Sequence, residues 1–186
     1  MILVNDFEKS MIEHVFLTSI VLGSVMLEPE VIITATERIE QDHNSPYYYG
    51  GGAIQTKNVA DCAWITPSLN KIVIAAKINL GHEYDIKHAW INSTPPGGYV
   101  RAHLHYGVDI SGVLYLQCSD DCGDLILVEP RPMFKMTRDY TKNSDTRIRP
   151  HVGGFVLFPS WLEHEVEPNK SMINRISVAF DLIKRE

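Results

Sequence analysis

The sequence predicts a mainly β fold with flanking helices, of the sandwich or jelly-roll class. From Asp85 onward, short runs rich in β-branched and aromatic residues alternate with turn clusters. Before that point, two segments contain helix-like patterns of apolar residues. Because no sharp change of composition marks a boundary, residues 1–186 are interpreted as one domain. Helices and supporting strands are expected in 1–84, and a jelly-roll core in 85–186.

Two helices are expected in the N-terminal part. The first is predicted within 28–42, where EPEVIITATERIEQD contains helix-like stretches. The second is predicted over 66–82, because apolar residues recur there at helical spacing. Thr66 or Ser68 is expected to cap its start, and Gly81 to end it.

Two other N-terminal segments flank these helices. Residues 15–27, VFLTSIVLGSVML, form the longest apolar run and predict a strand or two in the core. A signal peptide is disfavoured because acidic residues precede this run and a positively charged start is lacking. Residues 41–55 are rich in turn-forming residues and predict a loop, whose SPYYYGGG stretch either packs on the surface or covers a pocket.

The C-terminal core is expected to contain about eight short strands. Their sequences are, in chain order, KHAWINS, YVRAHLHY, SGVLYLQ, DLILVEP, RIRPHV, GFVLFPS, HEVEP and RISVAFDLI. Gly112 lies inside the third of these runs. A glycine inside a strand indicates a bulge or the close approach of another backbone segment.

Composition limits the classes of function. The chain of 186 residues has a net charge of −6, which disfavours nucleic acid as a partner. No segment reaches about 18 uncharged apolar residues, so no membrane span is predicted. The three cysteines, Cys62, Cys118 and Cys122, are too few for a disulfide framework, and this fits a cytoplasmic location.

The sequence RAHLHYGV places two histidines two residues apart. In an extended chain such side chains point to the same face, so His103 and His105 are expected side by side. Two imidazoles that only pack would each need a hydrogen-bond partner, whereas two that face a metal need only be neutral and well aimed. The choice between packing and metal binding depends on whether the chain supplies further ligands.

Two residues farther along the chain are candidates for the same site. His164 lies in FPSWLEHEVEPN, and a jelly roll can bring distant strands together at one end. Arg175 lies in RISVAF, where a cation among apolar residues is costly unless an anion pairs with it. If no acidic side chain fills that role, a bound carboxylate can, because guanidinium matches it with two parallel hydrogen bonds.

Three segments in order carry a resemblance to a known family. HLHYGVDISGVLYL, GGFVLFPSWLEHEVEPN and RISVAF resemble the iron(II)/2-oxoglutarate-dependent oxygenase superfamily, and within it the short oxygenases related to prolyl hydroxylases in bacteria and phages. The similarity runs from about Trp90 to Leu182, and WINSTPPGGYVRAH fits it as well. The resemblance implies a double-stranded β-helix, which is a distorted, cupin-like jelly roll, with iron at one end.

The resemblance also implies a cosubstrate site. The keto-acid end of 2-oxoglutarate would chelate the metal, and its far carboxylate would meet Arg175. Tyr115 matches a position that often donates a hydroxyl group to this carboxylate, and Ser177 completes an R-x-S pattern. Asn92 is a further candidate for a polar contact. With O2, 2-oxoglutarate would be converted to succinate and CO2 while a C–H bond of the substrate is hydroxylated.

One position departs from the family pattern. The superfamily usually has His-x-Asp or His-x-Glu and a distal histidine, the ligand set that suits non-haem Fe(II). Here His105 takes the place of the carboxylate, so the simplest interpretation is a metal held by His103, His105 and His164. Asp109 is an alternative third ligand if the loop bends. No catalytic residue beyond the metal ligands is predicted.

Three functions are open at this point. The first is an Fe(II)- and 2-oxoglutarate-dependent dioxygenase that hydroxylates a peptidyl or small-molecule substrate, as a monomer or homodimer. The second is a three-histidine cupin-type metalloenzyme without 2-oxoglutarate, in which Arg175 binds a carboxylate of the substrate. The third is a non-enzymatic jelly-roll binding module. The concentration of histidines and the buried-looking arginine favour an enzyme.

Overall fold

A computed structural model describes residues 17–42, 52–131 and 145–186. These residues form ten strands and two helices. In chain order they are β1 (Val21–Ser24), α1 (Pro29–Gln41), β2 (Ile54–Gln55), α2 (Thr66–Leu80), β3 (Tyr84–Thr94), β4 (Val100–His103), β5 (Ile110–Gln117), β6 (Leu125–Leu127), β7 (Thr146–Ile148), β8 (Gly154–Pro159), β9 (His164–Val166) and β10 (Arg175–Lys184). The mainly β prediction is therefore confirmed.

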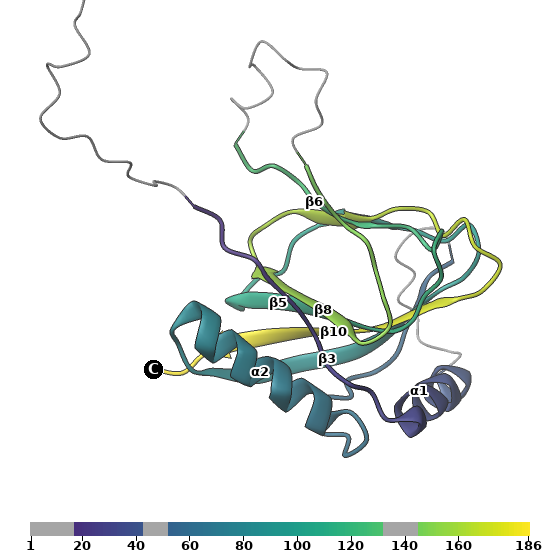
Figure 1. Cartoon of the computed structure of the whole chain (residues 1–186), viewed down its shortest axis with the longest axis horizontal. Coiled ribbons are helices and arrows are strands. Elements are labelled where there is room, and N and C mark those ends of the chain that lie inside the picture. The colour runs from purple at the N-terminus through teal and green to yellow at the C-terminus, as the bar shows by residue number, and fades with distance from the viewer. Residues whose placement is uncertain (1–16, 43–51, 132–144) are drawn as a thin grey trace, which may run out of the picture.

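The strands form two antiparallel sheets that face each other. The larger sheet has the order β1-β8-β5-β10-β3-β2, and the smaller has the order β4-β9-β6-β7. Figure 1 shows the two helices on the side of the larger sheet that faces away from the smaller one. All eight predicted core runs contain a strand, and the apolar run 15–27 supplies β1. The N-terminal part thus adds the two edge strands of the larger sheet.

The helices form where apolar spacing predicts them. In α1 the buried residues are Val31, Ala35 and Ile39, which recur every four residues along one face. Gly81 ends α2 in a left-handed conformation with φ 75°, as expected. The capping prediction for α2 is wrong, because its N-cap is Ile65 and no side chain caps the helix. The Thr66 hydroxyl instead donates to the carbonyl oxygen of Cys62, at 2.9 Å.

Two hydrophobic clusters stabilise the fold. The larger one joins both helices to the outer face of the six-stranded sheet, and its fully buried members include Leu69, Ile72, Leu114 and Val178. The smaller one lies between the sheets. It contains Leu125, Leu127, Val156, Phe158 and Leu162. Because apolar packing fills part of the interior, the polar residues described below are concentrated in the remainder.

Gly112 on β5 marks the close approach of a neighbouring aromatic side chain. A Cβ atom at this position would lie 2.3 Å from Cζ of Phe180 and 2.8 Å from Cδ2 of Leu157. We therefore expect Gly112→Ala to destabilise the protein by about 1–3 kcal/mol, the range for overpacking a core. Urea unfolding measures this difference, and an unchanged midpoint would show that the Phe180 ring moves aside without penalty.

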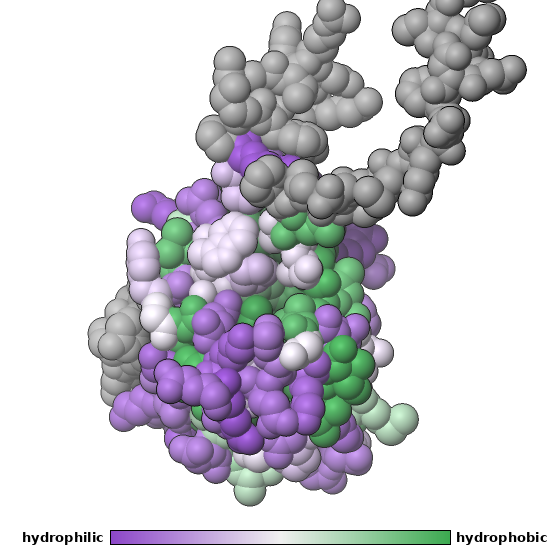
Figure 2. Space-filling view, turned by 90° about the vertical axis from the view of Figure 1, so that its left-hand side faces the viewer, coloured by the Kyte–Doolittle hydropathy of each residue, from purple (hydrophilic) through white to green (hydrophobic). Residues whose placement is uncertain are grey.

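Other expectations concern membrane spans, the cysteines and the predicted loop. Within the described residues, no helix is long and apolar enough to cross a membrane. The face in Figure 2 carries hydrophilic side chains at its centre with hydrophobic ones beside them. Cys62, Cys118 and Cys122 are all free. The SPYYYGGG stretch, predicted as a loop or pocket cover, lies outside the described residues except for its last glycine.

Candidate metal centre and anion site

Three histidines from separate parts of the chain converge at one end of the smaller sheet. His103 ends β4 and His164 begins β9, and the two are direct partners in the antiparallel register. His105 lies just after β4, where its backbone N–H donates to the carbonyl of Ser160 at 3.0 Å. One ring nitrogen from each histidine lies within 4.8 Å of those of the other two. The predicted trio therefore forms a single cluster.

Hydrogen bonds at Nδ1 fix the orientation of all three rings. The Nδ1 atom of His103 lies 2.8 Å from the carbonyl oxygen of Arg101, and that of His164 lies 3.0 Å from the carbonyl oxygen of Leu162. The Nδ1 atom of His105 lies 2.6 Å from Oδ1 of Asp181. Because each Nδ1 faces an acceptor, it carries the proton, and the lone pair lies on Nε2, the ring atom that can coordinate a metal.

The surroundings of His103 and His164 favour the neutral imidazole. Burial lowers the pKa of His164 to about 3, and burial is also the main reason why the pKa of His103 lies below its usual value. Neutral imidazole is the form that coordinates a metal ion. Imidazole ligands suit iron, zinc, copper and nickel, so the donor set fits a divalent transition metal.

Asp109, the alternative ligand, is not part of this cluster. Its Oδ2 atom accepts a hydrogen bond from the backbone N–H of Lys184 at 2.7 Å. The loop after His105 therefore directs this carboxylate toward the end of β10 and away from the imidazoles.

Arg175 is a buried cation at the start of β10, with 3% of its surface exposed. Its Nη1 donates to the carbonyl oxygens of Cys122 at 2.8 Å and Gly123 at 3.2 Å, and its Nη2 donates to Oγ1 of Thr94 at 3.2 Å. No carboxylate in the described part of the chain forms an ion pair with it. Burial lowers its pKa, yet a guanidinium stays charged at neutral pH. The arrangement can therefore accept an anion.

A row of polar side chains crosses the inner face of the larger sheet beside Arg175. Ser177 on β10 is paired with Asn92 on β3 and with Tyr115 on β5. Directly paired residues point to the same face, and Arg175 lies on that face because it is two residues before Ser177. Burial raises the pKa of Tyr115, so its hydroxyl stays protonated and can donate. All four residues predicted for the cosubstrate thus share one face.

A pocket of about 300 Å³ opens beside the histidines. It is lined by Gln55, Trp90, His103, Leu104, His105, Tyr106 and Asp181. The ring centroid of Trp90 lies 5.7 Å from that of His105. The indole Nε1 of Trp90 is buried and has no hydrogen-bond partner among the described residues. A ligand in this pocket can therefore meet an aromatic wall and the imidazoles together.

Sequence reasoning missed three of the residues beside the imidazoles: Gln55, Ser111 and Asp181. Asp181 had a usable signal, because it is a charge within the apolar run RISVAFDLI, like Arg175 at the other end of that run. Gln55 and Ser111 gave none, because polar uncharged residues in strands are common and their roles depend on strand pairing.

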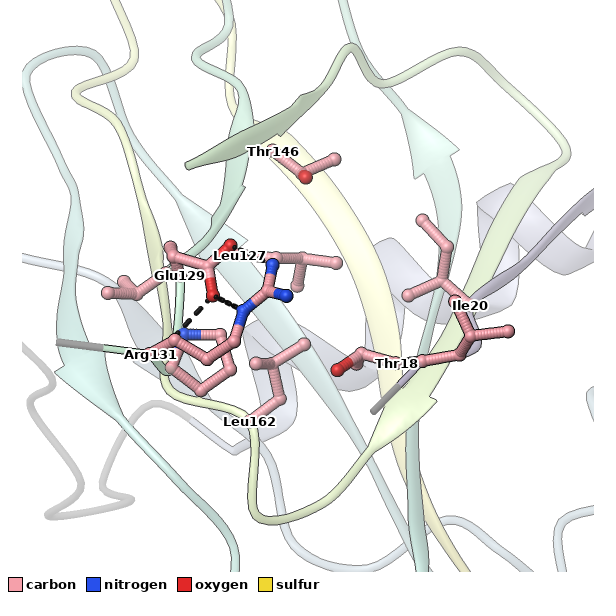
Figure 3. A pocket seen from close by; sticks show the side chains of 10 residues that line it. Thr18, Ile20, Leu127, Glu129, Arg131, Thr146 and Leu162 are labelled. Carbon is pink, nitrogen blue, oxygen red and sulfur yellow. Dashed lines mark hydrogen bonds and ion pairs between the residues drawn. The ribbon is translucent and has the colours of Figure 1, made fainter. Parts of the chain in front are cut away.

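Two other pockets lie away from the imidazoles. One of them has a volume of about 300 Å³ and is lined by Leu127, Leu162 and Ile20, among others. Figure 3 shows Glu129 and Arg131, which form an ion pair, on the side of this pocket opposite Ile20. None of the predicted site residues lines it. The other pocket, of about 530 Å³, is larger, and among the predicted residues only Tyr115 reaches it. The cluster of imidazoles, and not pocket size, therefore identifies the candidate site.

Comparisons with known proteins bear on the family and the fold of the chain. A family model described as "Putative 2OG-Fe(II) oxygenase" matches residues 88–181, just over half of the chain. A search of curated protein sequences finds no match.

Among solved structures, the chain is similar to a Pseudomonas putida prolyl-4-hydroxylase, with 17% identity, 91% of this chain and 94% of that chain covered, and a TM-score of 0.60. It is also similar to a prolyl hydroxylase in complex with a hypoxia inducible factor peptide fragment, from Trichoplax adhaerens, with 15% identity, 88% and 84% covered, and a TM-score of 0.60. A third structure is HygX from Streptomyces hygroscopicus with nickel, 2-oxoglutarate and hygromycin B bound, with 10% identity, 89% and 82% covered, and a TM-score of 0.63. These likenesses confirm the double-stranded β-helix fold.

Proposed function

This chain belongs to the 2OG-Fe(II) oxygenase family, and from that membership we propose that it hydroxylates a C–H bond of a small molecule or a peptide. The cofactors of the family are Fe(II), 2-oxoglutarate and O2. In such a reaction 2-oxoglutarate would be converted to succinate and CO2. One oxygen atom of O2 would enter succinate and the other would enter the substrate. The observation that carries the proposal is the cluster of three imidazoles together with a buried guanidinium that has no acidic partner among the described residues.

The proposed metal ligands are Nε2 of His103, His105 and His164. Their Nδ1 atoms are occupied by hydrogen-bond acceptors, which leaves only Nε2 for coordination. The rings are held by a strand pair and by neighbouring backbone atoms, so the ligands are preorganised. The Trp90 ring lies beside His105, with the ring centroids 5.7 Å apart.

The proposed role of Arg175 is to hold the far carboxylate of 2-oxoglutarate. Its burial and its lack of an acidic partner in the described residues support this role, since a buried charge is stable only when an opposite charge compensates it. The hydroxyl groups of Tyr115 and Ser177 can donate hydrogen bonds to the same carboxylate, and Asn92 can orient the cosubstrate from the neighbouring strand. Each of these residues would bind and orient, without transferring a proton.

The substrate is proposed to enter through the pocket that contains Trp90 and Tyr106. Its volume of about 300 Å³ suits a small molecule or one side chain of a peptide. The similar structures include a hydroxylase with a peptide bound and a protein with hygromycin B bound, so both classes occur on this fold.

Succinate formation tests this proposal. We expect purified protein, supplied with Fe(II), 2-oxoglutarate and O2, to form succinate slowly without substrate and faster when a matching small molecule or peptide is added. A chelator should stop the reaction and added Fe(II) should restore it, because the reaction depends on the metal that the three imidazoles are proposed to hold. Absence of succinate under every condition, from protein that binds Fe(II), would contradict the proposal.

The third imidazole favours one alternative, a metalloenzyme that does not use 2-oxoglutarate. Calorimetry separates the two. If 2-oxoglutarate binds only to the metal-loaded protein, the proposed function stands. If the metal binds and 2-oxoglutarate does not, the alternative stands, and Arg175 would then bind a carboxylate of the substrate itself.

A further inference from the structure

The three-histidine cluster lacks the negative charge that non-haem iron usually receives from its protein ligands. A set of two histidines and one carboxylate carries one negative charge. Three neutral imidazoles carry none, so a divalent ion at this site keeps its whole charge of +2 until a cosubstrate binds. The structure contains a carboxylate directly behind one of the imidazoles, and it belongs to Asp181.

Asp181 points into the space between the sheets from β10, and 8% of its side chain is exposed. Its Oδ1 lies 2.6 Å from Nδ1 of His105, which is at the short end for a charge-assisted hydrogen bond. The hydroxyl of Ser111 donates to the same Oδ1 at 2.8 Å and lies 3.1 Å from Nδ1 of His105. Ser111 and Asp181 are paired in the β5–β10 register, so the sheet fixes this geometry.

The carboxylate of Asp181 has little compensation from basic groups in the described part of the chain. Within the described residues, its one ion-pair partner is His105, and no lysine or arginine lies within 4.0 Å of it. A buried carboxylate is unfavourable unless it is paired with positive charge. A metal ion bound at Nε2 of His105 would supply such charge on the far side of the imidazole ring.

We propose that Asp181, acting through His105, supplies the negative charge that the metal ligands lack. The inference rests on the proposed metal site. Asp181 is a positioning residue: it holds the proton on Nδ1, aims Nε2 at the metal and makes the His105 imidazole a stronger donor. The combined charge of His105 and Asp181 then equals that of a ligating carboxylate, displaced outward by one ring.

Cobalt(II) binding to the intact protein tests this inference without any turnover. We expect Asp181→Asn to weaken Co(II) binding about 10–100-fold, the range for losing a partner behind a metal ligand. The substituted side chain is nearly isosteric, and its amide oxygen can still accept from His105. Asp85→Asn is the matched control, because it removes the same charge from the adjacent strand β3, where the carboxylate is paired with Arg185 on the surface. This control should change Co(II) affinity less than about twofold.

Two further readouts separate this role from a structural one. Without metal, Asp181→Asn should melt at the same temperature as the native protein or higher, because it removes an uncompensated buried charge. With Co(II), its melting temperature should rise less than that of the native protein. The visible absorption bands of bound Co(II) should shift in Asp181→Asn and stay unchanged in Asp85→Asn.

The outcomes distinguish this inference from the proposed function. If the native protein does not bind Co(II) or Fe(II), the metal site itself fails. If it binds and Asp181→Asn matches the Asp85→Asn control, only the role of Asp181 is overturned. If Asp181→Asn does not fold, Ser111→Ala takes its place, because the Ser111 hydroxyl holds the same oxygen. Co(II) binding should then weaken several-fold, and unchanged binding would overturn the inference.

Discussion

Replacing His164 with alanine is expected to abolish metal-dependent succinate formation and to weaken metal binding by more than about 100-fold. Loss of a residue that hydrogen-bonds to a metal ligand weakens metal binding by up to about that factor, and loss of the ligand itself weakens it more. His164 is also the most enclosed of the three imidazoles, with 5% of its surface exposed and the Phe158 ring 4.7 Å away. A water molecule is therefore poorly placed to substitute for it.

The measurement combines calorimetry with Fe(II) or Co(II) and succinate formation under air. His164→Gln is a second variant that keeps more of the buried volume, in case the alanine variant loses stability. His82→Ala serves as the control, because His82 is exposed and its Nε2 lies 3.2 Å from Lys184. Full activity in a folded His164→Gln protein would mean that the metal does not bind at this cluster.

Replacing Arg175 with glutamine is expected to raise the dissociation constant for 2-oxoglutarate about 30-fold or more. Removing one partner of a buried, hydrogen-bonded charge pair costs about 2–5 kcal/mol, and 1.4 kcal/mol corresponds to a factor of ten. Metal binding should be unaffected, because Arg175 does not belong to the histidine cluster. Weaker binding of 2-oxoglutarate together with unchanged binding of the metal is the result that the proposed anion site predicts.

Arg175 also has a structural role that the experiment must take into account. It holds the carbonyl groups of Cys122 and Gly123 between β5 and β6, so its loss can loosen that connection. Arg175→Lys keeps the charge but loses the planar guanidinium group. Its affinity for 2-oxoglutarate should lie between that of the native protein and that of Arg175→Gln. Arg185→Gln, on the exposed end of the chain, is the control. Equal binding of 2-oxoglutarate by native protein and a well-folded Arg175→Gln would disprove the anion site.

The sequence alone identified the site residues whose side chains are unusual among their neighbours in the chain. Two histidines at i and i+2 predicted a shared face, and their rings indeed lie 5.3 Å apart, even though His105 is beyond the end of β4. Arg175 was found because an arginine in an apolar strand needs a partner. Helix α2 was found from its apolar spacing and from Gly81, which needs a left-handed conformation.

Contacts that depend on strand register could not be predicted. Asp181 reaches His105 only because β10 pairs with β5 so that Asp181 lies opposite Ser111. A shift of one residue would turn every side chain of β10 to the other face. The predicted cap of α2 was wrong for a similar reason, because the Thr66 hydroxyl donates to the carbonyl of Cys62 in the preceding turn. Local sequence does not reveal such competition.

Strand β10 carries Arg175 at one end and Asp181 near the other, and it is hydrogen-bonded to β3 and β5 along both sides. A central strand cannot lengthen or slide without breaking two ladders, so the separation between these groups is fixed. Because Asp181 holds His105, the strand helps to fix the separation between the proposed metal site and Arg175, which the cosubstrate is to bridge. The number of carbon atoms in the keto acid, more than its charge, should decide whether the protein accepts it. Homologues of 2-oxoglutarate that are one carbon shorter or longer should therefore be poor replacements.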